Sequence, residues 1–123
     1  MIRLLAGLAD PETRAGVAQE LAAHVGARAC IGFVIDAGVG AWIVAPGFGQ
    51  RVLGGPGWRD LVSRLVSPGV HRGAVEIAEG EDPQPVIAVT SKRIALVFVA
   101  PSGDIDPSEV FLVAPLLEGA LCG

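Results

Sequence analysis

Two pairs of β-rich runs, each joined by only a few turn residues, limit most strongly what this chain can fold into. The runs and their turns are 30–35 and 41–45 joined by 36–40, and 85–90 and 93–100 joined at Ser91-Lys92. Such short connections join antiparallel neighbours, because parallel strands need a crossover of a dozen or more residues. A weakly alternating run over 73–79 predicts one more strand. We therefore expect an antiparallel sheet of about five strands.

Three segments have helical patterns. Asp10-Pro11-Glu12 provides an N-cap, a proline for the first turn and an acidic residue, and apolar residues recur at helical spacing until Gly26. Trp58, Leu61, Val62, Leu65 and Val66 form the clearest apolar stripe. Since both faces of the strand 31–35 are apolar or small, we expect a central strand with helices on both faces of the sheet.

The last helix, opened by Asp106-Pro107-Ser108-Glu109, is unusually apolar. Between Val110 and Leu121 its single charged residue is Glu118. A helix that is apolar nearly all round is either deeply buried or shared with a partner. We expect a homodimer formed through the terminal helices.

Composition narrows the class of protein. The chain has 123 residues, enough for one domain over 1–123, and its net charge of −4 disfavours nucleic-acid binding through a general basic field. No apolar run is long enough to insert in a membrane. The two cysteines, Cys30 and Cys122, lack the spacing of a redox pair, which is typical of a reducing, cytoplasmic setting.

Motifs for catalysis and metal binding are missing from the sequence. Gly47-Phe48-Gly49 begins a dinucleotide-like glycine pattern, but Val52 stands at its third glycine position. No serine lies in a nucleophile elbow, and His24, Cys30, His71 and Cys122 lack metal-ligand spacing. We expect neither catalytic nor metal-ligating residues, and no enzyme.

A small-molecule pocket is predicted around the glycine-rich segment 46–57. Phe48, Arg51, Trp58 and His71 bracket this segment and the helix that follows it. Loops with aromatic and polar members above a sheet are common ligand sites. The alternative is that Phe48 and Trp58 are core residues of their layer.

The expected order of elements resembles a GAF domain with a profilin-like α+β topology. The segment Glu20–Asp36 is similar to the opening of that family, and Ala45-Pro46-Gly47-Phe48-Gly49-Gln50 followed by Gly54-Gly55-Pro56-Gly57-Trp58 resembles N-terminal GAF-like domains of bacterial sensor histidine kinases. The resemblance implies terminal helices packed on one face and a ligand side under the middle helix. It further implies small-molecule sensing, dimerisation, and a longer signalling protein of which this chain is an excised part.

The family's cofactors do not transfer by this resemblance. The asparagine and lysine signature of cyclic-nucleotide GAF domains and the cysteines of bilin-binding and methionine sulfoxide reductase relatives are missing, so the cofactor is unknown. The main alternative is the roadblock fold, which has a similar element order and would make the chain a dimeric scaffolding module without a ligand. The long segment 46–57 favours the GAF-like interpretation.

Overall fold

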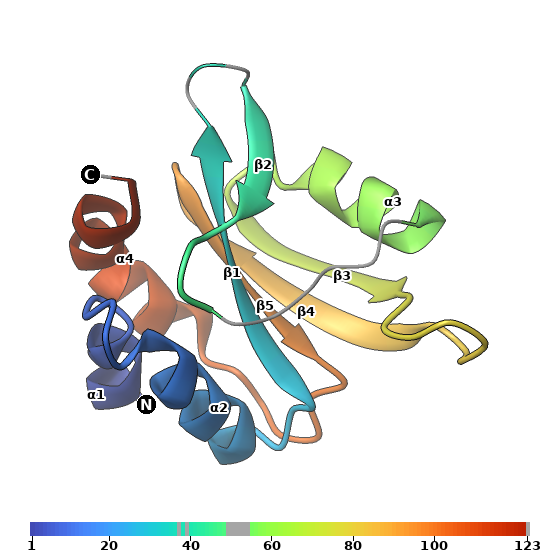
Figure 1. Cartoon of the computed structure of the whole chain (residues 1–123), viewed down its shortest axis with the longest axis horizontal. Helices are drawn as coiled ribbons and strands as arrows, with labels where there is room; N and C mark the ends of the chain where they lie inside the picture. The colour runs from blue at the N-terminus through green and yellow to red at the C-terminus, as the bar shows by residue number, and fades with distance from the viewer. Residues whose placement is uncertain (37, 39, 49–54, 123) are drawn as a thin grey trace.

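The described part of the chain folds into an α+β structure with four helices and a five-stranded antiparallel sheet (Figure 1). The computed structural model describes residues 1–36, 38, 40–48 and 55–122. In chain order the elements are α1 (Ile2–Gly7), α2 (Arg14–His24), β1 (Ala29–Asp36), β2 (Ala41–Val44), α3 (Pro56–Arg64), β3 (Gly69–Val75), β4 (Gln84–Thr90), β5 (Ile94–Val99) and α4 (Pro107–Cys122).

The strands are ordered β2-β1-β5-β4-β3, so both predicted hairpins are confirmed. In the first hairpin Phe33 pairs with Val44, and in the second Thr90 pairs with Ala95. β1 and β5 lie side by side at the centre of the sheet, with Ile31 opposite Val97. This arrangement is consistent with a GAF-like α+β fold.

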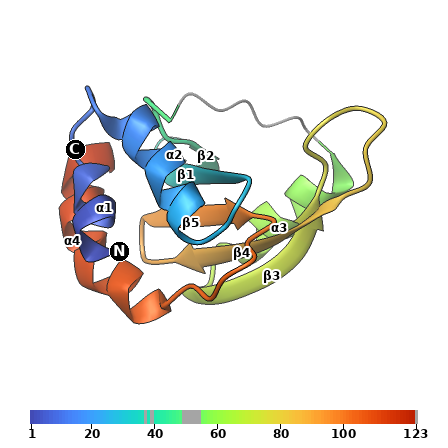
Figure 2. The ribbon, with the colours of Figure 1, turned by 90° about the horizontal axis from the view of Figure 1, so that it is seen from below.

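Helices cover both faces of the sheet, as expected. α1, α2 and α4 lie together on one face, and α3 lies alone on the other (Figures 1 and 2). α2 packs on β1, α4 packs on β1 and β5, and α3 packs on β3. We call the two sides the three-helix face and the α3 face.

Alternating residues of the central strands fill two separate cores. From β1, Cys30 and Val34 enter the core under α1, α2 and α4, whereas Ile31 and Phe33 enter the core under α3. The fully buried Phe98 of β5 belongs to the first core. The prediction that β1 is covered on both sides is confirmed, because successive side chains of a strand point to opposite faces.

Three elements differ from the prediction. α2 begins at Arg14, after a turn at Asp10-Pro11-Glu12 that was expected to open the helix. The short helix α1 was not expected, and it buries Leu5 against the three-helix face. β3 covers 69–75 rather than 73–79, and it lies at the edge of the sheet. An edge strand tolerates polar residues, so β3 includes His71 and Arg72, which directly precede the predicted run.

Candidate functional site

Glu76 ties the N-terminal end of α3 to the end of β3. The backbone N–H of Gly57 donates a 3.1 Å hydrogen bond to Oε1 of Glu76, and Nε1 of the Trp58 indole donates a 2.7 Å hydrogen bond to the Glu76 carbonyl oxygen. Gly55 is the N-cap residue of α3 and has no side chain to cap the helix. The carboxylate of Glu76 therefore accepts one of the N–H groups that a helix leaves free at its first turn.

This close approach of α3 to β3 requires glycine. A Cβ at Gly57 would overlap the carbonyl oxygen of Ala74, and a Cβ at Gly55 would lie 2.8 Å from Oε2 of Glu76. A larger residue at position 57 would push the helix away from the sheet, since the atom it meets belongs to the backbone of β3.

The site combines a charged carboxylate with an apolar hollow. Hydrogen bonding, above all from the N–H of Gly57, lowers the pKa of the Glu76 carboxyl. Its other oxygen, Oε2, is buried and has no hydrogen-bond partner among the described residues. Two open hollows meet at Gly55, one of about 370 Å³ beside Glu76 and one of about 320 Å³ beside Trp58 and Val62. These hollows are where a small molecule would meet α3.

The structure does not bring the four predicted ligand-binding residues together. Phe48 lies in the core of the three-helix face and Trp58 lies in the core of the α3 face, so the sheet separates them. The expectation that both line one pocket is corrected by this placement. The interpretation of both aromatics as core residues fits their burial, since 2% of Phe48 and 3% of Trp58 is exposed. Trp58 packs on Phe33 with ring centroids 5.9 Å apart.

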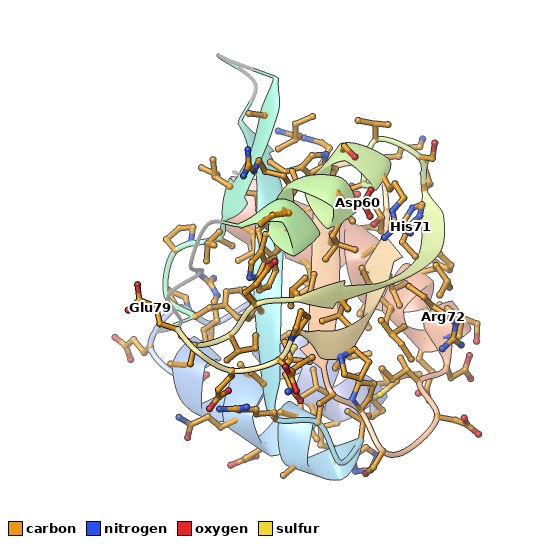
Figure 3. All side chains as sticks on the ribbon, turned by 90° about the vertical axis from the view of Figure 1, so that its right-hand side faces the viewer. Asp60, His71, Arg72 and Glu79 are labelled. Atoms are coloured by element: carbon orange, nitrogen blue, oxygen red, sulfur yellow. The ribbon has the colours of Figure 1, made fainter. Side chains whose placement is uncertain are left out.

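His71 and Arg51 do not join Trp58 either. His71 lies at the end of α3 away from Trp58, where its Nε2 is 2.6 Å from the carbonyl oxygen of Ser67. Figure 3 shows His71 beside Asp60, with Glu79 on the opposite side of the view. Arg51 lies outside the described residues. Trp58 alone of the described candidates lines a hollow of the site, at Gly55.

The outer face of α4 is a second candidate site. Phe111, Leu112 and Leu116 are exposed by 41%, 69% and 52% of their surface. The other exposed residues on this helix face are uncharged as well: Ser108, Pro115, Gly119 and Ala120. Positions 108, 111/112, 115/116 and 119/120 lie one helical turn apart, so they form one continuous stripe. We call these seven residues the α4 stripe.

Metal binding, a reactive thiol and a membrane-spanning helix find little support in the part of the chain that is described. Within it, no group of three or more His, Cys, Asp or Glu side chains could hold a metal ion. Cys30 is a free, buried thiol, and burial raises its pKa to about 12. None of the described helices has the length and apolar character needed to cross a membrane.

Comparison with known proteins adds no assignment. No protein-family model matches this chain, and neither a curated protein nor a solved structure matches it. The two candidate sites are therefore interpreted from their own geometry.

Glu76 is a site residue that the sequence analysis missed. A signal for it exists, because Gly55, Pro56 and Gly57 open a helix without a capping side chain. Such a helix needs an acceptor from elsewhere in the fold. The sequence does not reveal which of the acidic residues near 76–82 provides that acceptor.

Proposed function

We propose that this chain is a non-enzymatic regulatory module of a bacterial signalling protein, in the manner of a GAF-like domain of a histidine kinase, that works as a homodimer. The α4 stripe carries this proposal. It is an apolar helix face that no described part of the same chain covers. A cytoplasmic location belongs to the proposal, and the buried free thiol of Cys30 fits it.

A second copy of the chain is the partner that suits the stripe. The stripe has no charge that would require a complementary charge, so the same patch can face itself across a two-fold axis. At Gly119 a Cβ would meet nothing within 4 Å, which leaves room for another helix to approach closely. α1 packs beside α4 and adds Ile2, 40% exposed.

The size of this surface predicts a weak dimer. The 16 residues of α4 make a helix of about 24 Å, and one helix pair buries less than the roughly 800 Å² per partner of a standard interface. We therefore expect association in the micromolar range for the isolated chain.

A ligand-binding role for the α3 site is the second candidate function. The hollow of about 370 Å³ that Glu76 lines, which meets the Trp58 hollow at Gly55, favours it over the ligand-free, roadblock-like alternative. This role is independent of dimerisation, because α3 and α4 lie on opposite faces of the sheet. Thermal-shift screening of small molecules against wild type and Trp58→Phe would test it, since that ring lines the hollow.

Sedimentation velocity tests the dimer. Leu112→Glu places a charge in the stripe and is expected to give monomer at concentrations where wild type is dimeric. Val66→Glu is the matched control, because Val66 is 74% exposed and lies outside α4. A wild-type chain that remains monomeric at high micromolar concentration, or equal effects of the two variants, would contradict the proposal.

A further inference from the structure

The edge strand β3 offers a third surface, separate from both candidate sites. β3 is seven residues long and pairs with β4 on one side. No described strand pairs with its other side. The N–H and C=O groups that point outward from an edge strand can form hydrogen bonds with an added strand.

On the three-helix face, no described helix covers β3. α4 packs on β5 and β1 but leaves Val70, Arg72 and Ala74 exposed, and Val70 has 43% of its surface accessible. Beside them is a hollow of about 560 Å³ between Ile87 of β4 and residues 101–107, which lead into α4. The exposed side chains of β3 on this face are thus the apolar Val70, the positively charged Arg72 and the small Ala74.

Arg72 is the positively charged residue of this edge. Among the described residues its guanidinium forms no ion pair or hydrogen bond, and Figure 3 shows it at the margin of the molecule, apart from Asp60 and His71. On the α3 face, by contrast, Arg64 and His71 have partners. Arg64 of α3 forms an ion pair with Asp60 at 3.1 Å, and the His71 ring lies within hydrogen-bond distance of the Ser67 carbonyl oxygen. Asp104 is the acidic side chain that lines the hollow.

We propose that β3 binds an extended acidic peptide segment by strand addition. A carboxylate of the segment lies opposite Arg72, and apolar side chains two positions before and after it lie opposite Val70 and Ala74. The spacing follows from the strand period of two, and the charge pair follows from the cross-strand contact of directly opposed residues.

A second copy of this chain fits the edge less well. In the antiparallel register that pairs all seven residues of β3 with themselves, Arg72 faces Arg72 of the other copy. Like charges directly opposite one another destabilise a strand pair. The proposal is also independent of the dimer proposed above, since β3 and α4 are different surfaces.

The test uses a capped peptide as long as β3, Thr-Val-Thr-Glu-Thr-Val-Thr, and a matched peptide with Lys at its centre. Each is titrated into the ¹⁵N-labelled chain while amide shifts are followed. We expect shifts confined to β3 and its neighbours, and about fivefold tighter binding of the Glu peptide than of the Lys peptide. Arg72→Glu, an exposed substitution whose folding is checked by its Tm, should reverse this preference.

Four outcomes would overturn the proposal. They are no shift of β3 amides at low millimolar peptide, equal binding of both peptides to wild type, an unchanged preference in Arg72→Glu, and shifts of β3 amides on dilution of the protein alone. The last outcome would show that a second copy occupies the edge.

Discussion

The ring of Phe48 lies directly against the Cα of Gly32, in the core between the sheet and helices α1, α2 and α4. A Cβ at position 32 would overlap the ring. Phe48 follows β2, so this contact holds the segment after β2 against the middle of β1. An aromatic residue that the sequence placed in a ligand pocket is instead a core residue that needs glycine opposite it.

Gly32→Ala should therefore destabilise the fold. The added methyl group meets a buried aromatic ring rather than a flexible side chain, and overpacking of this kind costs about 1 to 3 kcal/mol. Urea unfolding measures the change. Gly16→Ala in α2, where a Cβ meets nothing within 4 Å, is the control and should raise stability by about 0.5 to 1 kcal/mol. Equal effects of the two substitutions would contradict the contact.

Arg14→Lys should also destabilise the fold, although it keeps the charge. The buried guanidinium donates hydrogen bonds to the carbonyl oxygens of Leu8, Pro46 and Ala9, at 2.7, 2.8 and 3.3 Å. A lysine ammonium cannot reproduce this planar, branched set of donors, so we expect a loss of about 2 to 4 kcal/mol. Arg3→Lys, at an exposed position of α1, is the control and should change the free energy of unfolding by less than about 0.5 kcal/mol.

Glu76 should make the free energy of unfolding fall as the pH is lowered. The Gly57 hydrogen bond lowers the pKa of the Glu76 carboxyl in the folded state. Its contribution to stability is therefore fully present above the pKa that a glutamate has in the unfolded chain, and it is lost as pH falls through the folded-state pKa. Glu76→Gln removes this titration and should reduce the loss of stability between about pH 7 and about pH 3. Urea unfolding at both pH values, with Glu79→Gln as control, measures the difference. Acid dependence identical in Glu76→Gln and wild type would contradict the assignment.

Asp106 should likewise make the free energy of unfolding fall as the pH is lowered. Hydrogen bonds from the Ser108 hydroxyl and backbone N–H lower the pKa of its carboxyl at the start of α4. Glu76→Gln should therefore reduce the acid dependence without abolishing it.

Cys30 should be unreactive in the native protein. Burial keeps its thiol protonated, with a pKa of about 12, and only the thiolate reacts at an appreciable rate. We expect a disulfide reagent to modify residue 30 at a rate that rises with urea in parallel with unfolding, as measured by peptide mass spectrometry. Rapid modification in native buffer would show that the three-helix face opens locally.

Most of the fold follows from local sequence patterns. Short turns predicted both hairpins, Asp106 and Pro107 predicted the start of α4, and the stripe beginning at Trp58 predicted α3. These signals act within a few residues of the chain and depend little on tertiary contacts. α1 was missed because six residues are too few to establish a helical period.

The site was less predictable, because burial depends on partners that are distant in sequence. Nothing near Phe48 in the chain indicates that Gly32 leaves space for its ring. Likewise, the pairing of Glu76 with Gly57 spans 19 positions. By contrast, the apolar character of α4 was visible in the sequence, because Glu118 is its single charged residue between Val110 and Leu121. That a partner shares the exposed part of this helix stays a prediction.

The most direct test of the α4 dimer is an isotope-filtered NOE experiment. A mixture of labelled and unlabelled chains at high micromolar concentration reports only contacts between two copies. If the α4 stripe forms the dimer interface, intermolecular NOEs are expected among Phe111, Leu112 and Leu116. Intermolecular NOEs from Val70 of β3 instead, or none under conditions where sedimentation finds a dimer, would contradict it.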